Sequence, residues 1–493
     1  MVNNKIAPTQ ILIAGITLLI YTLSLTFHCI GGVFNIQSVN LLITSIILLN
    51  IYIAVFVVKK PRRHITLIIF TLSFNLLMMG KVYVSWIKSY NNLPESLSAD
   101  SYPHLYSSIN LLFISLLVIV LTYQVFALIL GKREDAIDSQ TIATLNKNQA
   151  LTDTVRKISQ IAFFVSAVGA FSSLAINIVF ILRVGYMQSF VEHAQVPAII
   201  SIWGTFFLPS FVLFLATKPS KKQLIIPMGI YALGMGLTLL TGRRNMLVRD
   251  LLMLVIYIVM RDDLRGTAKK FITKTIALIS ALIGVVLLYA LNFINIIRGI
   301  KTEGSSGIIS TIVNFISSQG VSFRVVVKTI ESYPEFDRLT APHFLFYPIE
   351  LYMNNNIFSQ FLFGTVPIAE TQTESFAQGT FNLGHKLTYM FDPSRYLDGG
   401  GFGTAYIAES YLAFNIVGVI LVSIMLGALI RYSSSILTRT PFVAALGLIL
   451  IRYLVYVPRN FAFGWVFEVF NFTYIIFFMV VYFFALILNK WTK

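Results

Sequence analysis

Four arginines stand at the edges of apolar stretches, where a charged side chain is unfavourable. They are Arg243 and Arg244 in the turn after Gly242, Arg298 at the end of another apolar run, and Arg459 between two further runs. A charge deep in a bilayer costs about 2.5–3.5 kcal/mol on insertion scales, so it tends to be kept for a purpose. A guanidinium group stays charged and donates hydrogen bonds in a fork that matches phosphate oxygens in pairs. The alternative for any single arginine is that it reaches lipid phosphate at the interface. Several such positions together favour a shared phosphate ligand.

Two further residues could hold or transfer a proton. Glu409 lies about two helical turns into an apolar run, after the glycine-rich segment 398–404. Burial would raise the pKa of its carboxyl group and an arginine partner would lower it, so Glu409 is a candidate base, a ligand for a hydroxyl group, or half of a structural ion pair. His385 follows Gly384 in a polar segment and can accept a proton near neutral pH, although a loop histidine can also be merely solvated.

Arg249 and Asp250 are adjacent inside a predicted span. Neighbours in sequence point about 100° apart on a helix, so these two side chains cannot face each other. Each is therefore predicted to pair with another helix in a structural role. Glu468 lies in the last predicted span. Like Glu409, it is a candidate base, a ligand for a hydroxyl group, or half of a structural ion pair, and the ion pair is favoured.

The elements that position these residues are predicted to be membrane helices. Of the 493 residues, 56% are hydrophobic and 12% are charged, whereas a soluble domain carries about 25% charged residues. Repeated apolar runs of about 20 residues indicate an all-α polytopic membrane protein. The runs predict about twelve spans, near 9–29, 37–58, 65–87, 107–130, 159–182, 197–217, 223–241, 245–260, 273–296, 403–430, 441–457 and 464–488.

The basic residues indicate the orientation of these spans. Lysines and arginines cluster after spans two, four, six, eight and ten and at the end of the chain, which places both termini in the cytoplasm. The net charge of +16 is therefore a topology signal, and it does not indicate a nucleic-acid partner. The connector 131–159 is predicted to be a cytoplasmic loop.

The longest interruption of the apolar pattern is predicted to lie outside the cytoplasm. It divides the chain into a bundle of about nine spans (1–296), a large extracytoplasmic loop (297–402) and a bundle of about three spans (403–493). Acidic residues outnumber basic ones in the loop, and it is rich in aromatic residues. Apolar residues at helical spacing over 308–327 predict short helices at the membrane interface.

Several kinds of chemistry lack their sequence motifs. Cys29 is the only cysteine, which excludes an intrachain disulfide. No phosphate-binding P-loop and no His-Glu-x-x-His pair occurs. The first outer loop, 30–37, contains no acidic residue. We therefore expect no metal and no cofactor, and a metal-independent reaction.

Four patches of the sequence resemble the Wzy family of O-antigen and capsule repeat-unit polymerases. The likeness covers the plan of spans and these patches in the same order. The patches are Gly242-Arg243-Arg244; Arg298-Gly299 followed by 318–322; Gly401-Phe402-Gly403-Thr404 followed by 408–418; and Val457-Pro458-Arg459-Asn460.

The resemblance implies a reaction between two undecaprenyl-diphosphate-linked glycans in the bacterial cytoplasmic membrane. One glycan is the donor and the other the acceptor, and the active site faces away from the cytoplasm. Arg243, Arg298 and Arg459 would bind diphosphate with help from Arg244, and Glu409 or His385 would activate or position the acceptor hydroxyl. Membrane lipids and a chain-length co-polymerase are the other partners implied. The alternatives are an O-antigen ligase-like enzyme, which needs a different acceptor, and a flippase or transporter of lipid-linked sugar.

Overall fold

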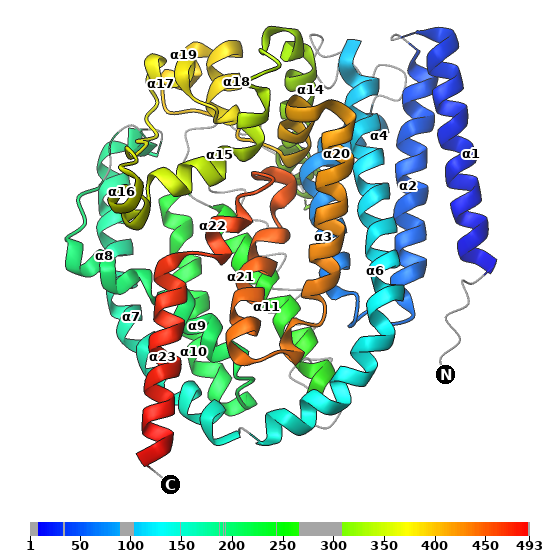
Figure 1. Cartoon of the computed structure of the whole chain (residues 1–493). Helices are drawn as coiled ribbons and strands as arrows, with labels where there is room; N and C mark the ends of the chain where they lie inside the picture. Colours follow the sequence, from blue (N-terminus) through cyan, green and yellow to red (C-terminus); the bar gives the residue numbers. More distant parts are fainter. Residues whose placement is uncertain are drawn as a thin grey trace.

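The computed structural model describes residues 8–32, 35–88, 103–147, 149–186, 188–190, 192, 194–242, 244–265 and 308–491. Within these ranges the regular structure is helical and contains no strand (Figure 1). This agrees with the all-α class expected from the composition. The predicted span near 273–296 lies outside the described residues.

Nine helices or helix pairs of the described chain are long and apolar enough to cross a membrane. Two more predicted spans are helical but do not meet that description. One, α21 (Pro441–Leu454), is shorter, and the other, α11 (Arg244–Arg265), carries several charged residues. The count of twelve therefore stays a prediction. The nine are α1 (Pro8–Gly31), α2 (Ile36–Val58), α3 (Ile65–Phe74) with η1 (Asn75–Met79) and α4 (Gly80–Lys88), the first part of α6 (Leu105–Lys147), α7 (Gln149–Val184), α8 (Ala198–Thr205) with α9 (Phe207–Ala216), α10 (Lys221–Leu237) with η4 (Thr238–Thr241), α20 (Tyr406–Ser433), and α22 (Trp465–Val469) with α23 (Phe472–Trp491).

The expectation of a loop over 131–159 was wrong. Helix α6 continues to Lys147 and α7 begins at Gln149, so most of this connector is helical. Its sequence contains alanine, leucine, lysine and glutamine, which favour helix even where no apolar face is present. The polarity of the segment indicates exposure to water, but it does not indicate an irregular backbone.

The segment 308–402 forms a series of short helices, as expected. They are α13 (Ile308–Gln319), α14 (Ser322–Ser332), η6 (Tyr333–Glu335), α15 (Ala341–Asn354), α16 (Ile357–Phe363), α17 (Glu374–Gly379), α18 (Leu383–Phe391) and α19 (Pro393–Leu397). The stretch 308–327, whose apolar spacing is helical, forms two helices that are separated at Gly320. A Cβ atom at Gly320 would lie 2.0 Å from the backbone nitrogen of Lys81, so only glycine fits there. Helix α14 is also largely buried against α6 and α20, although its residue Arg324 is exposed.

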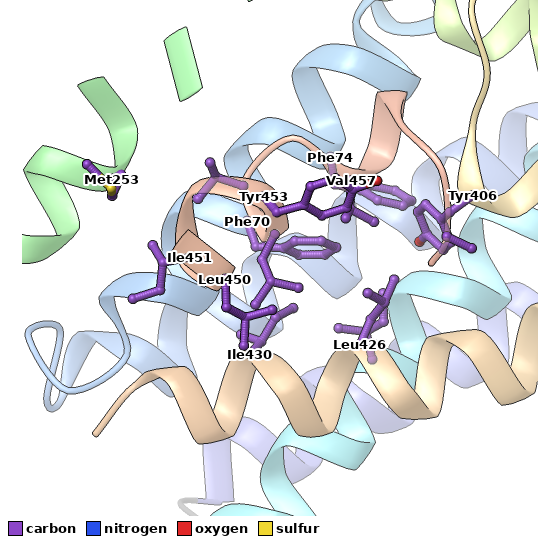
Figure 2. Packing of buried hydrophobic residues seen from close by; sticks show 14 of the residues in the cluster. Phe70, Phe74, Met253, Tyr406, Leu426, Ile430, Leu450, Ile451, Tyr453 and Val457 are labelled. Carbon is purple, nitrogen blue, oxygen red and sulfur yellow. The ribbon is translucent and has the colours of Figure 1, made fainter. Parts of the chain in front are cut away.

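The core joins the two predicted bundles. Phe70 and Phe74 of α3 pack among buried residues of α20, α21 and η8 (Val457–Arg459), as Figure 2 shows. The hydroxyl of Ser115 on α6 lies 2.6 Å from that of Tyr406 and 2.7 Å from that of Ser423, both on α20. Residues near the end of the sequence are therefore fixed against helices from its first quarter.

Two ends of the helical bundle can be distinguished in Figure 1. Helix α1 begins and α23 ends at the lower side of the view, whereas α17, α18 and α19 lie at the top. The first and last described helices therefore start and finish at the end opposite to these short helices. Which of these ends faces the cytoplasm stays a prediction from the basic clusters.

Candidate active site

The turn that carries the paired arginines is built around Gly242. This residue ends η4 with φ +71°, a left-handed conformation that glycine adopts without strain. A Cβ atom at Gly242 would lie 2.4 Å from the ring of Tyr186. Arg244 then begins α11, and Arg243 lies outside the described residues. A helix N-terminus carries partial positive charge, so an arginine at this position does not stabilise the helix. An anion bound there would be stabilised by the helix N-terminus and by the arginine.

A cavity of about 430 Å³ adjoins this turn. It lies between α7, α8, α10 and the start of α11, and its lining includes Thr241 and Met246 on either side of the turn. Several polar lining residues direct their side chains to carbonyls of their own helices. These hydrogen bonds are Asn177 Nδ2 to Ser173 O, Thr205 Oγ1 to Ser201 O, Thr238 Oγ1 to Met235 O and Thr241 Oγ1 to Thr238 O. The lining therefore offers mainly nonpolar contact.

Arg459 is half-buried at the end of η8. Its side chain makes no hydrogen bond or ion pair with any residue that the structure describes. The chain leading into η8 is held by α3, because Ser73 Oγ donates a hydrogen bond to Val455 O at 2.5 Å. A guanidinium group in this partly desolvated position still has donors available for an anion.

The elements that carry Arg244 and Arg459 are linked through the π-helical segment η1 and Phe315 of α13. η8 contacts η1 directly. Leu76 of η1, Leu239 of η4 and Val248 of α11 all pack against Phe315. A shared role for the predicted arginines stays a proposal. Arg298, like Arg243, lies outside the described residues.

Glu409 is completely buried and is bonded through both carboxylate oxygens. Thr404 Oγ1 donates to Oε1 at 2.5 Å, and the Ala462 N–H donates to Oε2 at 2.9 Å. No described lysine or arginine forms an ion pair with it, so the predicted alternative of an arginine partner finds no support in the described residues. The carboxylate instead joins the glycine-rich segment to the loop that follows Arg459.

His385 lies in a separate group of polar side chains. Its Nδ1 is 2.9 Å from the hydroxyl of Tyr396, and that hydroxyl donates its proton to Thr371 O at 3.1 Å. Since a tyrosine hydroxyl has one proton, Nδ1 of the neutral ring donates to the Tyr396 oxygen, and Nε2 keeps its lone pair. Burial lowers the pKa of His385, and the charge of Glu370 acts in the opposite direction. The ring is therefore neutral, and a proton acceptor, at neutral pH.

Glu370 is a further member of this group, and no sequence motif pointed to it. Its Oε1 accepts hydrogen bonds from Tyr347 OH and Asn382 Nδ2, both at 2.8 Å. Burial, and then Glu370, raise the pKa of Tyr396 to about 12. His385 and Glu409 do not contact each other, but their segments do, because Gly384 packs against Gly403. The other loop histidine, His343, lies 2.6 Å from Glu350 Oε1.

The charged residues inside the bundle pair as expected, each with another helix. Asp250 of α11 binds Arg452 of α21, with 2.6 Å between Oδ1 and Nε. Arg249 Nη2 lies 3.0 Å from Glu468 of α22, and Arg452 Nη1 lies 3.1 Å from the same carboxylate. Tyr231 OH also donates to Asp250 at 2.7 Å. We call Arg249, Asp250, Arg452 and Glu468 the buried quartet.

A comparison with protein families identifies the group to which this fold and these residues belong. The sequence model of the family described as O-antigen polysaccharide polymerase Wzy matches residues 16–491. The chain belongs to this Wzy family. None of the curated proteins and none of the solved structures that were compared matches the chain.

Membership in the Wzy family confirms the resemblance of the sequence patches. It implies a multi-pass membrane polymerase of O-antigen repeat units, with lipid-linked oligosaccharides as substrates. The match extends over the Gly242 turn, Glu409 and Arg459 alike. It does not assign a role to any of them, so the roles of these residues are argued below as a proposal.

Proposed function

We propose that the chain joins undecaprenyl-diphosphate-linked repeat units at the extracytoplasmic face of the bacterial cytoplasmic membrane, without a metal ion. The observation that supports this proposal is the link between the Arg459 element and the Arg244 helix through η1 and Phe315, together with a cavity of mainly nonpolar lining beside the Gly242 turn. The diphosphate would bind Arg243, Arg244, Arg298 and Arg459. Part of its isoprenoid chain would lie in the cavity, whose volume is within the range of ligand sites, about 300–1,000 Å³.

The reaction makes one bond and breaks one. The hydroxyl oxygen of the acceptor sugar attacks the anomeric carbon of the donor glycan, and the bond from that carbon to the diphosphate oxygen breaks. Undecaprenyl diphosphate leaves with the electron pair, and the hydroxyl proton passes to a base. Guanidinium groups already in place stabilise the charge that develops on the leaving diphosphate.

The surroundings of His385 and Glu409 support different roles for them. His385 is neutral with Nε2 available, which suits a general base. Glu409 is enclosed and has both oxygens occupied. We therefore assign it a positioning role, in which it keeps the glycine-rich segment and the Arg459 loop together.

A reconstitution experiment tests the proposed function. Purified protein in detergent would receive only an undecaprenyl-diphosphate-linked repeat unit, with EDTA present. We expect a ladder of glycans longer than one repeat. A ligase would give no product from the repeat unit alone, and would transfer glycan once a second acceptor is added. Absence of any new glycosidic bond under all conditions would contradict an enzyme and favour transport.

Substitution of Glu409 separates positioning from proton transfer. We expect Glu409→Ala to lose most activity, because Thr404 and the Ala462 N–H lose their acceptor. Leaving a buried polar group without a partner costs about 1–3 kcal/mol of stability. Glu409→Gln keeps an acceptor oxygen for Ala462 and should retain measurable polymerisation. Initial rates of ladder formation and thermal stability would be compared. Equal inactivity of both variants, with normal stability, would instead make Glu409 a base.

The pH profile tests His385. Burial lowers its pKa below the ordinary value of about 6.5, so the ring stays neutral at neutral pH and the rate should fall only in more acidic buffer. His385→Gln should lower the rate by about 10²–10⁴-fold and remove the acidic limb of the profile. His343→Gln is the matched control, since His343 pairs with Glu350 and should leave the limb unchanged. An acidic limb that survives in His385→Gln would exclude His385 as the base.

A further inference from the structure

Two arginines from different helices face one aromatic ring outside the region of η1 and η8. The guanidinium carbon of Arg324, on α14, lies 4.7 Å from the ring centroid of Phe402, and that of Arg395, on α19, lies 5.6 Å from the same centroid. Both arginines are exposed, whereas the ring of Phe402 is buried. Both guanidinium groups therefore lie within about 6 Å of one ring centroid.

The platform under these arginines is rigid. The Phe402 N–H donates to Thr388 Oγ1 at 2.9 Å, and Thr388 in turn donates to Gly384 O at 2.5 Å. The side chain of Arg395 lies across Gly400, where a Cβ atom would be 2.6 Å from its Cγ. The backbone under the ring and the stem of Arg395 are therefore held by the fold.

The nearest carboxylate contact at this place is to the backbone, since the Arg395 N–H donates to Asp392 Oδ1 at 3.2 Å. Neither Arg324 nor Arg395 forms an ion pair with a described carboxylate. Lys328, one turn further along α14, is neutralised by Glu331 at 2.8 Å. A single cation over a ring gains about 0.5–1 kcal/mol at an exposed site, but two cations at the same ring also repel each other. An anion between them would remove this repulsion.

Arg324 follows a contact between its segment and a candidate membrane span. The turn before α14 places Gly320 directly against Lys81, in the last third of the span Ile65–Lys88. Arg395 is the neighbour of Tyr396, which holds His385. One arginine is therefore carried by the helix that follows this span contact, and the other by the helix that holds the candidate base.

We propose that Arg324, Arg395 and Phe402 form a second diphosphate subsite, which holds one of the two lipid-linked substrates while the arginines around η1 hold the other. This inference rests on the proposed function, since joining two lipid-linked glycans requires two diphosphates at once. Two forked guanidinium groups over a flat ring suit the oxygens of a diphosphate. We call this place the Phe402 subsite.

Binding stoichiometry with a short diphosphate tests the Phe402 subsite. Farnesyl diphosphate would be titrated into the purified full chain in detergent and followed by calorimetry. We expect two equivalents for the wild type and one for Arg324→Ala/Arg395→Ala. The single equivalent left in that variant shows that it is folded. Arg459→Ala should weaken the other equivalent, and Arg338→Ala, at an exposed arginine of the same segment, should change neither.

Further arms identify the ligand and the outcomes that overturn the inference. Inorganic pyrophosphate should compete for both equivalents, whereas glucuronate should compete for neither; competition by glucuronate at the Phe402 subsite alone would reassign it to an acidic sugar. Two equivalents retained in Arg324→Ala/Arg395→Ala, or one equivalent in the wild type, would overturn the proposal. These results do not depend on polymer formation, so a failed reconstitution and a failed second subsite are distinguishable.

Discussion

Arg459→Ala is expected to leave cells with single lipid-linked repeats and without long chains. The half-buried Arg459 has no side-chain partner among the described residues, so its donors are available for the diphosphate that leaves in the proposed reaction. Removing one such electrostatic donor lowers catalytic rates by about 10²–10³-fold. Arg459→Lys keeps the charge but loses the fork, and should fall between the wild type and Arg459→Ala. The length distribution of glycans on a gel measures the effect.

The control for this prediction is Arg338→Ala. Arg338 is an exposed arginine of the segment 308–402, in the turn before α15, and should leave the ladder unchanged. Membrane levels of each variant must be equal for the comparison to count. A normal ladder from Arg459→Ala would remove Arg459 from the diphosphate site.

Arg452→Leu is expected to destabilise the protein more than any other single change considered. It leaves Asp250 buried with only Tyr231 as a partner, whereas Glu468 keeps Arg249. Removing one partner of a buried ion pair costs about 3–5 kcal/mol, because the remaining charge stays uncompensated. The temperature at which half of the purified protein remains monodisperse in detergent would report the loss.

The double variant Arg452→Leu/Asp250→Asn supplies the matched control. It removes both charges of one pair, and its asparagine oxygen can still accept from Tyr231. It should recover most of the lost stability, since replacing both charges of a buried pair is often nearly neutral. If the single variant were as stable as the wild type, or the double variant less stable than the single one, the buried quartet would not stabilise the fold in this way.

The buried quartet also shows which contacts can be predicted from the sequence and which cannot. Helix geometry alone predicted that Arg249 and Asp250 would pair with other helices, and the structure confirms it. The partners themselves lie about 200 residues later in the chain, and only the packing of α11 on α21 selects them. The membrane spans themselves were predictable from the sequence, because the length of an apolar run is a local property.

Other features depend on backbone contacts that side-chain types do not reveal. Glu409 was identified as unusual, but one of its two donors is the main-chain N–H of Ala462, which any residue type could supply. Glu370 and Arg324 looked like ordinary loop charges until the fold placed them beside His385 and Phe402. The break between α13 and α14 depends on the approach of Gly320 to Lys81, a contact between distant segments.

The composition of the buried quartet has an electrical consequence. It contains two cations and two anions, so its net charge is zero. Moving one elementary charge through 100 mV involves about 2.3 kcal/mol of work, but a neutral group experiences no net force from a transmembrane voltage. The voltage of a respiring cell therefore leaves this core where it is, and the core keeps the same position in a vesicle that has lost its ion gradients.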